Sequence, residues 1–359
     1  MLNRRHILTT ASVLAASVAL PKFAFAAEPV IGLSLPITGA QAEVAKDLLA
    51  GYEKALKAVN GPLVLRVLDD GIVPETTAKN METLAADPQV IGISGIVGTP
   101  NAQAALPVAV RLDLPVVGIR SGASSLRDGQ DGVFHLRASY EDELDKIAAM
   151  CAGAGLKKIV IVHSDDSFGK GTMAHLKTKL ESLGVSIISS NPVNRNGEKM
   201  GRALSRAGAD VKKADAAVGV VLLMISKPMM EAVKELREKH HIVMPIFAMS
   251  ITATRALMTS REPALAGMGI VTAFPLPRSI SNSLAAQYKA DITAQGRPEL
   301  IESLTAFKGY FYGSVFARAA AAGYTRASLV KRLNAGINFT GRDVTFDKQK
   351  VGFHYLEVI

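Results

Sequence analysis

IGISGIVGTPNAQAALPVAVRLDLPVVGIRSGASSLR, residues 91–127, is the stretch that decides the fold of this chain. An apolar run, Val90–Ser94, has the character of a buried strand, and two glycines shortly after it allow the chain to turn sharply. Thr99 then precedes a proline, which is the arrangement typical of a helix N-cap and first turn. A strand, a tight turn and a helix extending to about Arg111 are therefore expected here.

A second apolar run, Leu114–Gly118, opens into a small polar loop that contains Arg120, Ser121 and Ser124. Two strand ends would then offer hydroxyls, backbone N–H groups and one guanidinium side by side. Helix N-termini and the carboxyl ends of parallel strands attract negative charge, so the stretch predicts a site for a small anion, most simply a carboxylate. A plain helix cap that contacts no ligand explains Thr99 equally well.

The same alternation of strand and helix runs through most of the chain. It begins at the apolar run Val30–Leu35, continues into the central stretch, and restarts near Arg137 with the strands Lys157–His163 and Ala216–Ile225. A final strand is expected at Val351–Val358. Uninterrupted alternation predicts an α/β protein whose parallel sheets are covered by helices on both faces, as in two doubly wound lobes.

Composition sets further limits. The chain has 359 residues, of which 48% are apolar and 20% charged, and this length suggests about two domains or lobes. The sequence carries no nucleophile-elbow, zinc-protease or phosphate-loop motif, so no enzyme activity, metal or cofactor is expected. Cys151 is the single cysteine, which excludes an internal disulfide.

Residues 1–26 have the features of an export signal. Arg4 and Arg5 precede a modest apolar stretch, and the small residues around Phe25 predict cleavage before Ala27. The paired arginines are similar to a twin-arginine signal, although the general secretory route remains an alternative. Without this segment the net charge falls from +9 to +6, and it is spread without long runs of like charge, which does not favour nucleic acid as a partner.

Several segments, in this order, resemble the branched-chain amino-acid-binding family, the type I periplasmic binding proteins that serve ABC importers. They read IGLSLPITG, GISGIVGTPNAQAALP, PVVGIRSGASSLRD, DGVFHLRASY, DDSFGKG and GIVTAFPLP. The resemblance implies two lobes that close on a solute like a hinged trap. The expected lobes are residues 27–138 with 275–338 and residues 139–274 with 339–359. Their three hinge crossings are expected near residues 137–140, 272–275 and 336–343.

The resemblance also implies roles for individual residues. Thr99 and Ser121 would hold a ligand carboxylate, and Phe168 would supply an aromatic side chain from the second lobe. Ser226 and Ser250, which follow later strands, complete the expected site.

Arg120 and one missing residue bear on the choice of ligand. A guanidinium could clamp a carboxylate with two hydrogen bonds, although a surface salt bridge is the alternative for Arg120. The family's amino-acid binders usually carry an acid after the strand equivalent to residues 246–248, whereas this chain has none before Glu262. An unpaired amine in a closed cleft costs several kcal/mol, so a simple α-amino acid is in doubt as the ligand.

Together these features predict a periplasmic, non-enzymatic solute-binding protein. It would deliver a small carboxylate-bearing solute, amino-acid-like or an organic acid, to an ABC permease in the inner membrane, and it would act as a monomer. Two alternatives stay open. The same fold could serve as a ligand-sensing receptor for a membrane signalling protein, or the chain could be an exported enzyme with an unrecognised site.

Overall fold

The first lobe is built on a five-stranded sheet of order β2-β1-β3-β4-β5 in which all neighbouring strands are parallel. The structure is a computed structural model that describes residues 28–279, 281–339 and 342–359, so the expected export signal lies outside the described residues. The strands are β1 (Val30–Leu35), β2 (Val64–Asp69), β3 (Val90–Ser94), β4 (Val116–Val117) and β5 (Val133–Phe134). Every residue of β1 and β3 is buried, as expected of apolar strands covered on both faces.

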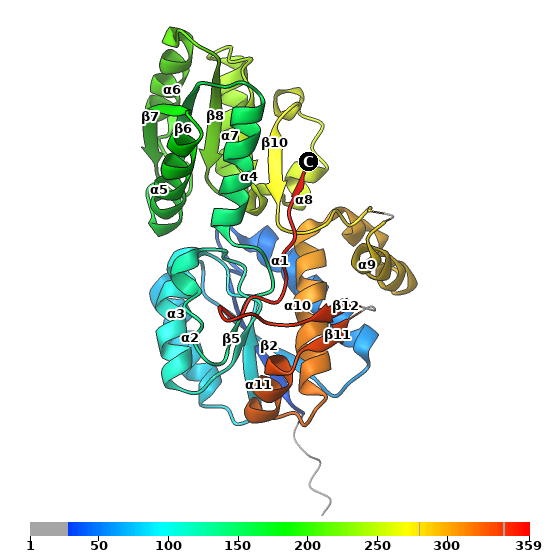
Figure 1. The fold of residues 1–359 in the computed structure, drawn as a ribbon. Helices are drawn as coiled ribbons and strands as arrows, with labels where there is room; N and C mark the ends of the chain where they lie inside the picture. The colour runs from blue at the N-terminus through cyan, green and yellow to red at the C-terminus, as the bar shows by residue number, and fades with distance from the viewer. Residues whose placement is uncertain (1–27, 280, 340–341) are drawn as a thin grey trace, which may run out of the picture.

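Helices cover both faces of this sheet (Figure 1). They are α1 (Ala42–Val59), α2 (Pro74–Ala85), α3 (Thr99–Arg111), α10 (Leu304–Ala320) and α11 (Arg326–Asn334). The α1 and α10 backbones approach closely because two glycines face each other's helix. A Cβ atom on Gly51 would lie 2.0 Å from the Ala306 carbonyl oxygen, and one on Gly309 would lie 2.1 Å from that of Leu48. Larger residues at these two positions would push the helices apart.

The second lobe has a six-stranded sheet of order β13-β10-β9-β8-β6-β7. Its strands are β6 (Lys158–Ser164), β7 (Ser186–Val193), β8 (Val218–Leu223), β9 (Ile246–Met249), β10 (Gly269–Thr272) and β13 (Glu357–Val358), and only the edge strand β13 runs antiparallel. Its main helices are α4 (Tyr140–Gly153), α5 (Ser167–Ser182), α6 (Gly201–Lys213) and α7 (Ser226–Glu238). The predicted α/β fold with two parallel-sheet lobes is therefore confirmed.

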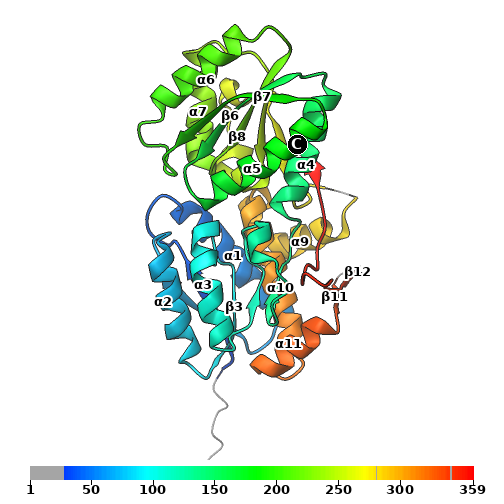
Figure 2. The ribbon, with the colours of Figure 1, turned by 60° about the vertical axis from the view of Figure 1, so that its left-hand side comes forward.

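Shorter elements connect these layers. They are the helices α8 (Arg255–Met258) and α9 (Ser283–Ala294), and the 3-10 turns η1 (Ser124–Leu126), η2 (Ser250–Thr252), η3 (Pro263–Leu265) and η4 (Pro298–Glu302). Figure 2 shows the two lobes stacked end to end, with α5 of the second lobe in contact with α3 of the first. None of the helices in the described ranges combines the length and the apolar character needed to cross a bilayer.

The third crossing between the lobes lies later in the chain than the sequence suggested. A hairpin of β11 (Ile337–Phe339) and β12 (Arg342–Val344) lies beside α10, and a bridge between His135 and Val351 keeps the chain on the first lobe. Only then does the chain rise to β13, as the red segment in Figure 1 shows. The crossing thus follows Val351 and does not lie near residues 336–343.

The expected strand at Val351–Val358 is accordingly reduced to its last part. Phe353 packs among buried aromatic side chains, with its ring centroid 4.9 Å from that of Phe311 on α10 of the first lobe and 5.1 Å from that of Phe274. This burial fixes the segment on the first lobe, so only Glu357–Val358 reaches the second sheet.

Candidate functional site

The facing ends of the two sheets enclose a cavity where the strand order of each sheet reverses. In the first sheet the reversal lies between β1 and β3, which are followed by Gln41 and Thr99. In the second sheet it lies between β6 and β8, which are followed by Phe168 and Ile225. All four residues line the same cavity. Open α/β sheets bind ligands at such reversal points, so this cavity is the candidate site.

We call this cavity the inner compartment. It is lined by Gln41, Val97, Gly98, Thr99, Arg120, Tyr140, Phe168, Arg195, Ile225 and Ile251. Its volume is about 30 Å³, which is room for little more than one water molecule. The lobes are therefore nearly closed over it in this conformation.

A second cavity, the outer compartment, shares Gln41 with the inner one and encloses about 320 Å³. Its lining comes from the starts of α1 and α10 in the first lobe and from the starts of α7 and α8 in the second. Ligand pockets commonly measure about 300–1,000 Å³, so the cleft as a whole has the size of a small-solute site.

Helix N-termini give the inner compartment a positive character. The residues that cap α1, α3 and α7 are Gln41, Gly98 and Ile225, and all three line this compartment. Because the unpaired N–H groups of a helix start carry partial positive charge, three such ends favour an anion.

Thr99 contributes a hydroxyl and is not the helix cap. It is the first residue of α3, whose N-cap is Gly98 with a φ of 94° and no capping side chain. The Thr99 hydroxyl instead lies 2.8 Å from that of Ser121, and both residues are buried. Ser121 Oγ also accepts a hydrogen bond from the backbone N–H of Ala123 at 3.3 Å. The alternative in which Thr99 acts only as a cap is therefore wrong.

Arg120 is buried and has no acidic partner among the residues that the structure describes. Its side chain lies at the inner compartment, and its Nε has no hydrogen-bond partner among the described residues. Burial lowers the pKa of this guanidinium, and the nearby Arg137 lowers it further. The surface-salt-bridge alternative does not apply, because the residue is 7% exposed and no ion pair joins it to another described residue.

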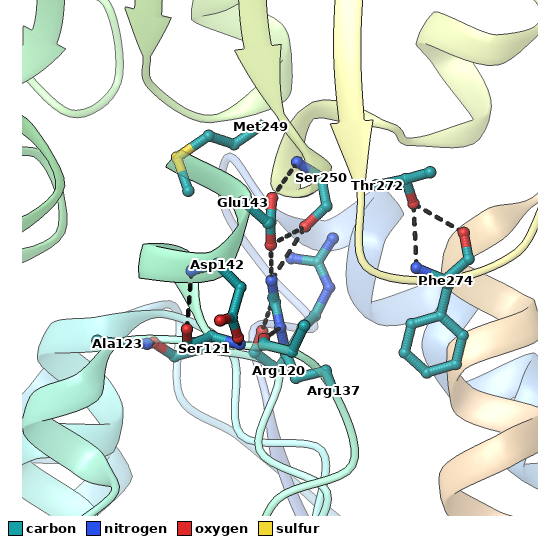
Figure 3. Close-up of polar contacts among 12 residues, drawn as sticks. Arg120, Ser121, Ala123, Arg137, Asp142, Glu143, Met249, Ser250, Thr272 and Phe274 are labelled. Carbon is teal, nitrogen blue, oxygen red and sulfur yellow. Dashed lines mark hydrogen bonds and ion pairs between the residues drawn. The ribbon is translucent and has the colours of Figure 1, made fainter. Parts of the chain in front are cut away.

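Arg137 and Glu143 form a buried ion pair at the first crossing (Figure 3). Arg137 also donates to the carbonyl oxygen of Arg120 at 2.7 Å. Glu143, on α4, accepts further hydrogen bonds from the backbone N–H and the hydroxyl of Ser250, both at 2.8 Å. This network joins the Arg120 loop of the first lobe to α4 and η2 of the second.

The four remaining predicted residues do not lie together. Phe168 is buried and packs edge-on against Tyr140, with ring centroids 5.2 Å apart. Ser226 lines the outer compartment, where its hydroxyl lies 2.7 Å from that of Thr254. Ser250 lines neither compartment, since its hydroxyl is engaged with Glu143. Ser124 is exposed on η1 and lines neither compartment.

Arg195 was not among the residues expected at the site. It follows β7, which extends to Val193 and brings Arg195 to the inner compartment. Arg195 Nη1 lies 3.0 Å from Asp166, and a Cβ atom at position 98 would lie 2.7 Å from Arg195 Nη2. The turn signal Asn194–Gly197 after the strand could have identified this loop.

Two parallel-sheet lobes that enclose a cavity at their facing strand ends define a two-lobed ligand-binding protein. A family model described as periplasmic binding protein matches residues 28–350, and the chain belongs to this family. The resemblance seen in the sequence is thus confirmed.

Relatives and solved structures agree with this assignment. The chain is 26% identical over 223 residues to the Leu/Ile/Val-binding protein homolog 1 of Brucella melitensis biotype 1, and the match spans 58% of each protein. It has the fold of a substrate-binding periplasmic protein from Ralstonia solanacearum, with a TM-score of 0.79 and 23% identity. The match covers 92% of this chain and 96% of that protein. A solute-binding protein of an ABC transporter from R. palustris in complex with benzoate has a TM-score of 0.79, 15% identity and 92% coverage of both chains.

Proposed function

We propose that this chain is a periplasmic solute-binding protein that captures a small carboxylate-bearing solute between its lobes and delivers it to an ABC importer. The first lobe would comprise residues 28–138 and 275–353, and the second lobe residues 139–274 and 357–359. The export signal expected at residues 1–26 would direct the chain to the periplasm, where it would act as a monomer with an inner-membrane permease as its partner.

The observation that supports this proposal most strongly is the buried Arg120 guanidinium, which has no acidic partner among the described residues, at the meeting point of both strand-order reversals. A buried cation without a counter-charge is costly, and a carboxylate would offset that cost through two parallel hydrogen bonds. The Thr99 and Ser121 hydroxyls lie beside it as further donors.

The ligands of similar proteins support a carboxylate on the solute. They do not decide whether the solute also carries an amine. Similar proteins include a Leu/Ile/Val-binding protein homologue and a solute-binding protein in complex with benzoate, and both kinds of ligand carry a carboxylate. No Asp or Glu is found among the described residues that line the inner compartment. An ammonium group there would lose its hydration without gaining a carboxylate, so we favour an organic acid over a simple amino acid.

Thermal-shift measurements and calorimetry test this proposal on protein that has been unfolded and refolded to remove any bound solute. The matched probes are leucine and 4-methylpentanoate, which differ only by the amine, and benzoate with its neutral analogue benzamide. We expect 4-methylpentanoate or benzoate to stabilise the protein more than leucine or benzamide. Two outcomes would contradict recognition of an organic acid. One is stabilisation by benzamide as large as that by benzoate, and the other is stabilisation by leucine without stabilisation by 4-methylpentanoate or benzoate.

Delivery to an importer is tested separately. The solute-loaded protein should stimulate ATP hydrolysis by its permease in proteoliposomes, whereas solute alone should not. Absence of stimulation together with tight binding would favour the sensing role.

A further inference from the structure

The region behind the inner compartment contains more buried positive than negative charge. Arg120, Arg127, Arg137 and Lys308 are each at most 7% exposed, and Glu143 is the buried acid among them. Arg127 donates to the backbone carbonyl oxygens of residues 137 and 138 and forms no ion pair with a described residue.

These cations influence one another's protonation. Burial lowers the pKa of Arg127 to about 10, and the neighbouring Arg137 contributes to this shift. Burial also lowers the pKa of the Lys308 ammonium well below its usual range, and both Arg120 and Arg137 lower it further. Uncompensated charge of one sign in a protein interior is costly, and an anion in the adjoining cavity would reduce that cost.

A second guanidinium reaches the same compartment from the opposite lobe. Arg195 follows β7 and pairs with Asp166 through one of its terminal nitrogens, while its Nε is buried without a hydrogen-bond partner among the described residues. Asp166 uses its other oxygen, Oδ1, to cap α5 through the Gly169 N–H and to accept a hydrogen bond from Ser164, so Oδ2 is left for Arg195. This ion pair occupies one terminal nitrogen of Arg195, and its Nε keeps hydrogen-bonding capacity.

Between the two arginines the lining is largely apolar. Phe168, Tyr140, Ile225 and Ile251 of the second lobe and Val97 of the first all line the inner compartment. A solute that fits this lining has an apolar middle part and polar groups at its ends.

From this arrangement we propose that the solute is a dicarboxylate with an apolar core, whose two carboxylates are bound by Arg120 of the first lobe and Arg195 of the second. This inference rests on the proposed function and narrows it to one substrate class. The inner compartment measures about 30 Å³ in this conformation, so the lobes must part to admit such a solute. A dianion held between the two guanidiniums then gains a charge-assisted contact with each of them. Arg195 thereby becomes a specificity-determining residue, because it distinguishes solutes with a second carboxylate from those with one.

Calorimetry at low ionic strength with matched acids tests this inference. Terephthalate is compared with benzoate, and glutarate with valerate, so that each pair differs only in the second carboxylate. We expect at least one dicarboxylate to bind about tenfold or more tightly than its monocarboxylate partner, an effect that weakens with added salt. The pair with the larger ratio identifies the core as aromatic or aliphatic.

Two variants locate the second carboxylate. In Arg195→Gln, the ratio between monocarboxylate and dicarboxylate dissociation constants should fall to about one or two, while circular dichroism and the unfolding temperature check the fold. Arg206→Gln is the matched control, because Arg206 is exposed on α6, away from both compartments, and this variant should keep the wild-type ratio.

The outcomes separate the two proposals. Equal affinity of both members of each pair for the wild-type protein, or an unchanged ratio in Arg195→Gln, would overturn the dicarboxylate inference and leave carboxylate capture intact. Binding of leucine without binding of any of the four acids would overturn both.

Discussion

Arg255 of the second lobe contacts both carboxylate oxygens of Asp47 in the first lobe, with its Nε and one terminal nitrogen each 3.2 Å from an oxygen. Asp47 lies on α1 and Arg255 begins α8, so this two-point ion pair spans the cleft at the outer compartment. Ser303 also donates to Asp47, at 2.6 Å, and holds its carboxylate in place. The contact joins the lobes directly beside the candidate site.

Replacing Arg255 by Gln should favour the open form of the protein. The ion pair can form only when the lobes are together, so its loss raises the free energy of closure and weakens ligand binding. We expect the affinity for benzoate or terephthalate, whichever binds the wild type, to fall by on the order of tenfold. Calorimetry measures the affinity, and small-angle X-ray scattering should detect a larger radius of gyration.

Arg111→Gln is a matched control for this experiment. Arg111 pairs with Glu82 at 3.3 Å within the first lobe, and both side chains are well exposed. An equal loss of affinity in this variant would show that removal of any arginine ion pair has the same effect and would contradict a role of Arg255 in closure.

Arg120→Ala should weaken a carboxylate ligand more strongly than any change at the rim of the cleft. The substitution removes the buried guanidinium that has no acidic partner in the described part of the chain, together with its charge-assisted hydrogen bonds. We expect the dissociation constant to rise by on the order of tenfold or more. The unfolding temperature without ligand should not fall, because an uncompensated buried charge is removed. Unchanged affinity in calorimetry would place Arg120 outside the site.

Glu143→Gln should destabilise the protein substantially. Glu143 is completely buried, and its loss as an anion leaves Arg137 without its counter-charge at the first crossing. Removing one partner of a buried ion pair lowers the free energy of unfolding by about 3 kcal/mol or more. Urea unfolding measures this loss, and Glu181→Gln on the exposed side of α5 is the control, with an expected change below about 0.5 kcal/mol. A loss as small as that of the control would contradict a structural role of the network.

His135 should make the stability depend on pH. Burial, aided by the charge of Arg127, lowers its pKa to about 3 in the folded protein, whereas an unfolded histidine titrates near about 6.5. Well above about pH 6.5 both states hold a neutral ring and this group does not affect stability. As the pH falls from about 6.5 toward 3, only the unfolded state takes up the proton, so stability decreases by about 1.4 kcal/mol per pH unit.

Urea unfolding between pH 7.5 and 5 measures this effect. The wild type should lose about 2 kcal/mol from this group between pH 6.5 and 5, and His135→Gln should lack that part of the dependence. His354→Gln, whose side chain is 60% exposed, should retain it. Identical pH profiles for the wild type and His135→Gln would contradict the assignment.

The sequence predicted the layers of the fold well because buried parallel strands are continuous apolar runs. Val30–Leu35 and Val90–Ser94 were expected as strands with the bounds that the structure gives them. The C-terminal region was less predictable, because the position of Phe353 depends on aromatic partners far away in the chain. No local pattern in residues 351–358 indicates that contact.

The candidate site was predictable only in part, for a similar reason. Thr99, Arg120 and Phe168 follow recognisable strands, and all three line the inner compartment. Ser250 is hydrogen-bonded to Glu143, which lies 107 positions away in the chain. Residue types alone do not reveal this tertiary contact. That Arg120 forms no ion pair within residues 28–279, 281–339 and 342–359 likewise depends on the neighbours that the fold provides.

The pairing of Val271 with Val358 links β10 to a strand that the chain reaches only after its long passage through the first lobe. During synthesis on the ribosome, β10 therefore emerges with an open edge that stays unpaired until the returning segment has been made. Exposed strand edges are sites of aggregation, so the nascent second lobe should depend on chaperones during this interval. An isolated fragment of residues 139–274 should for the same reason associate with itself, and addition of a β13 peptide should suppress that association.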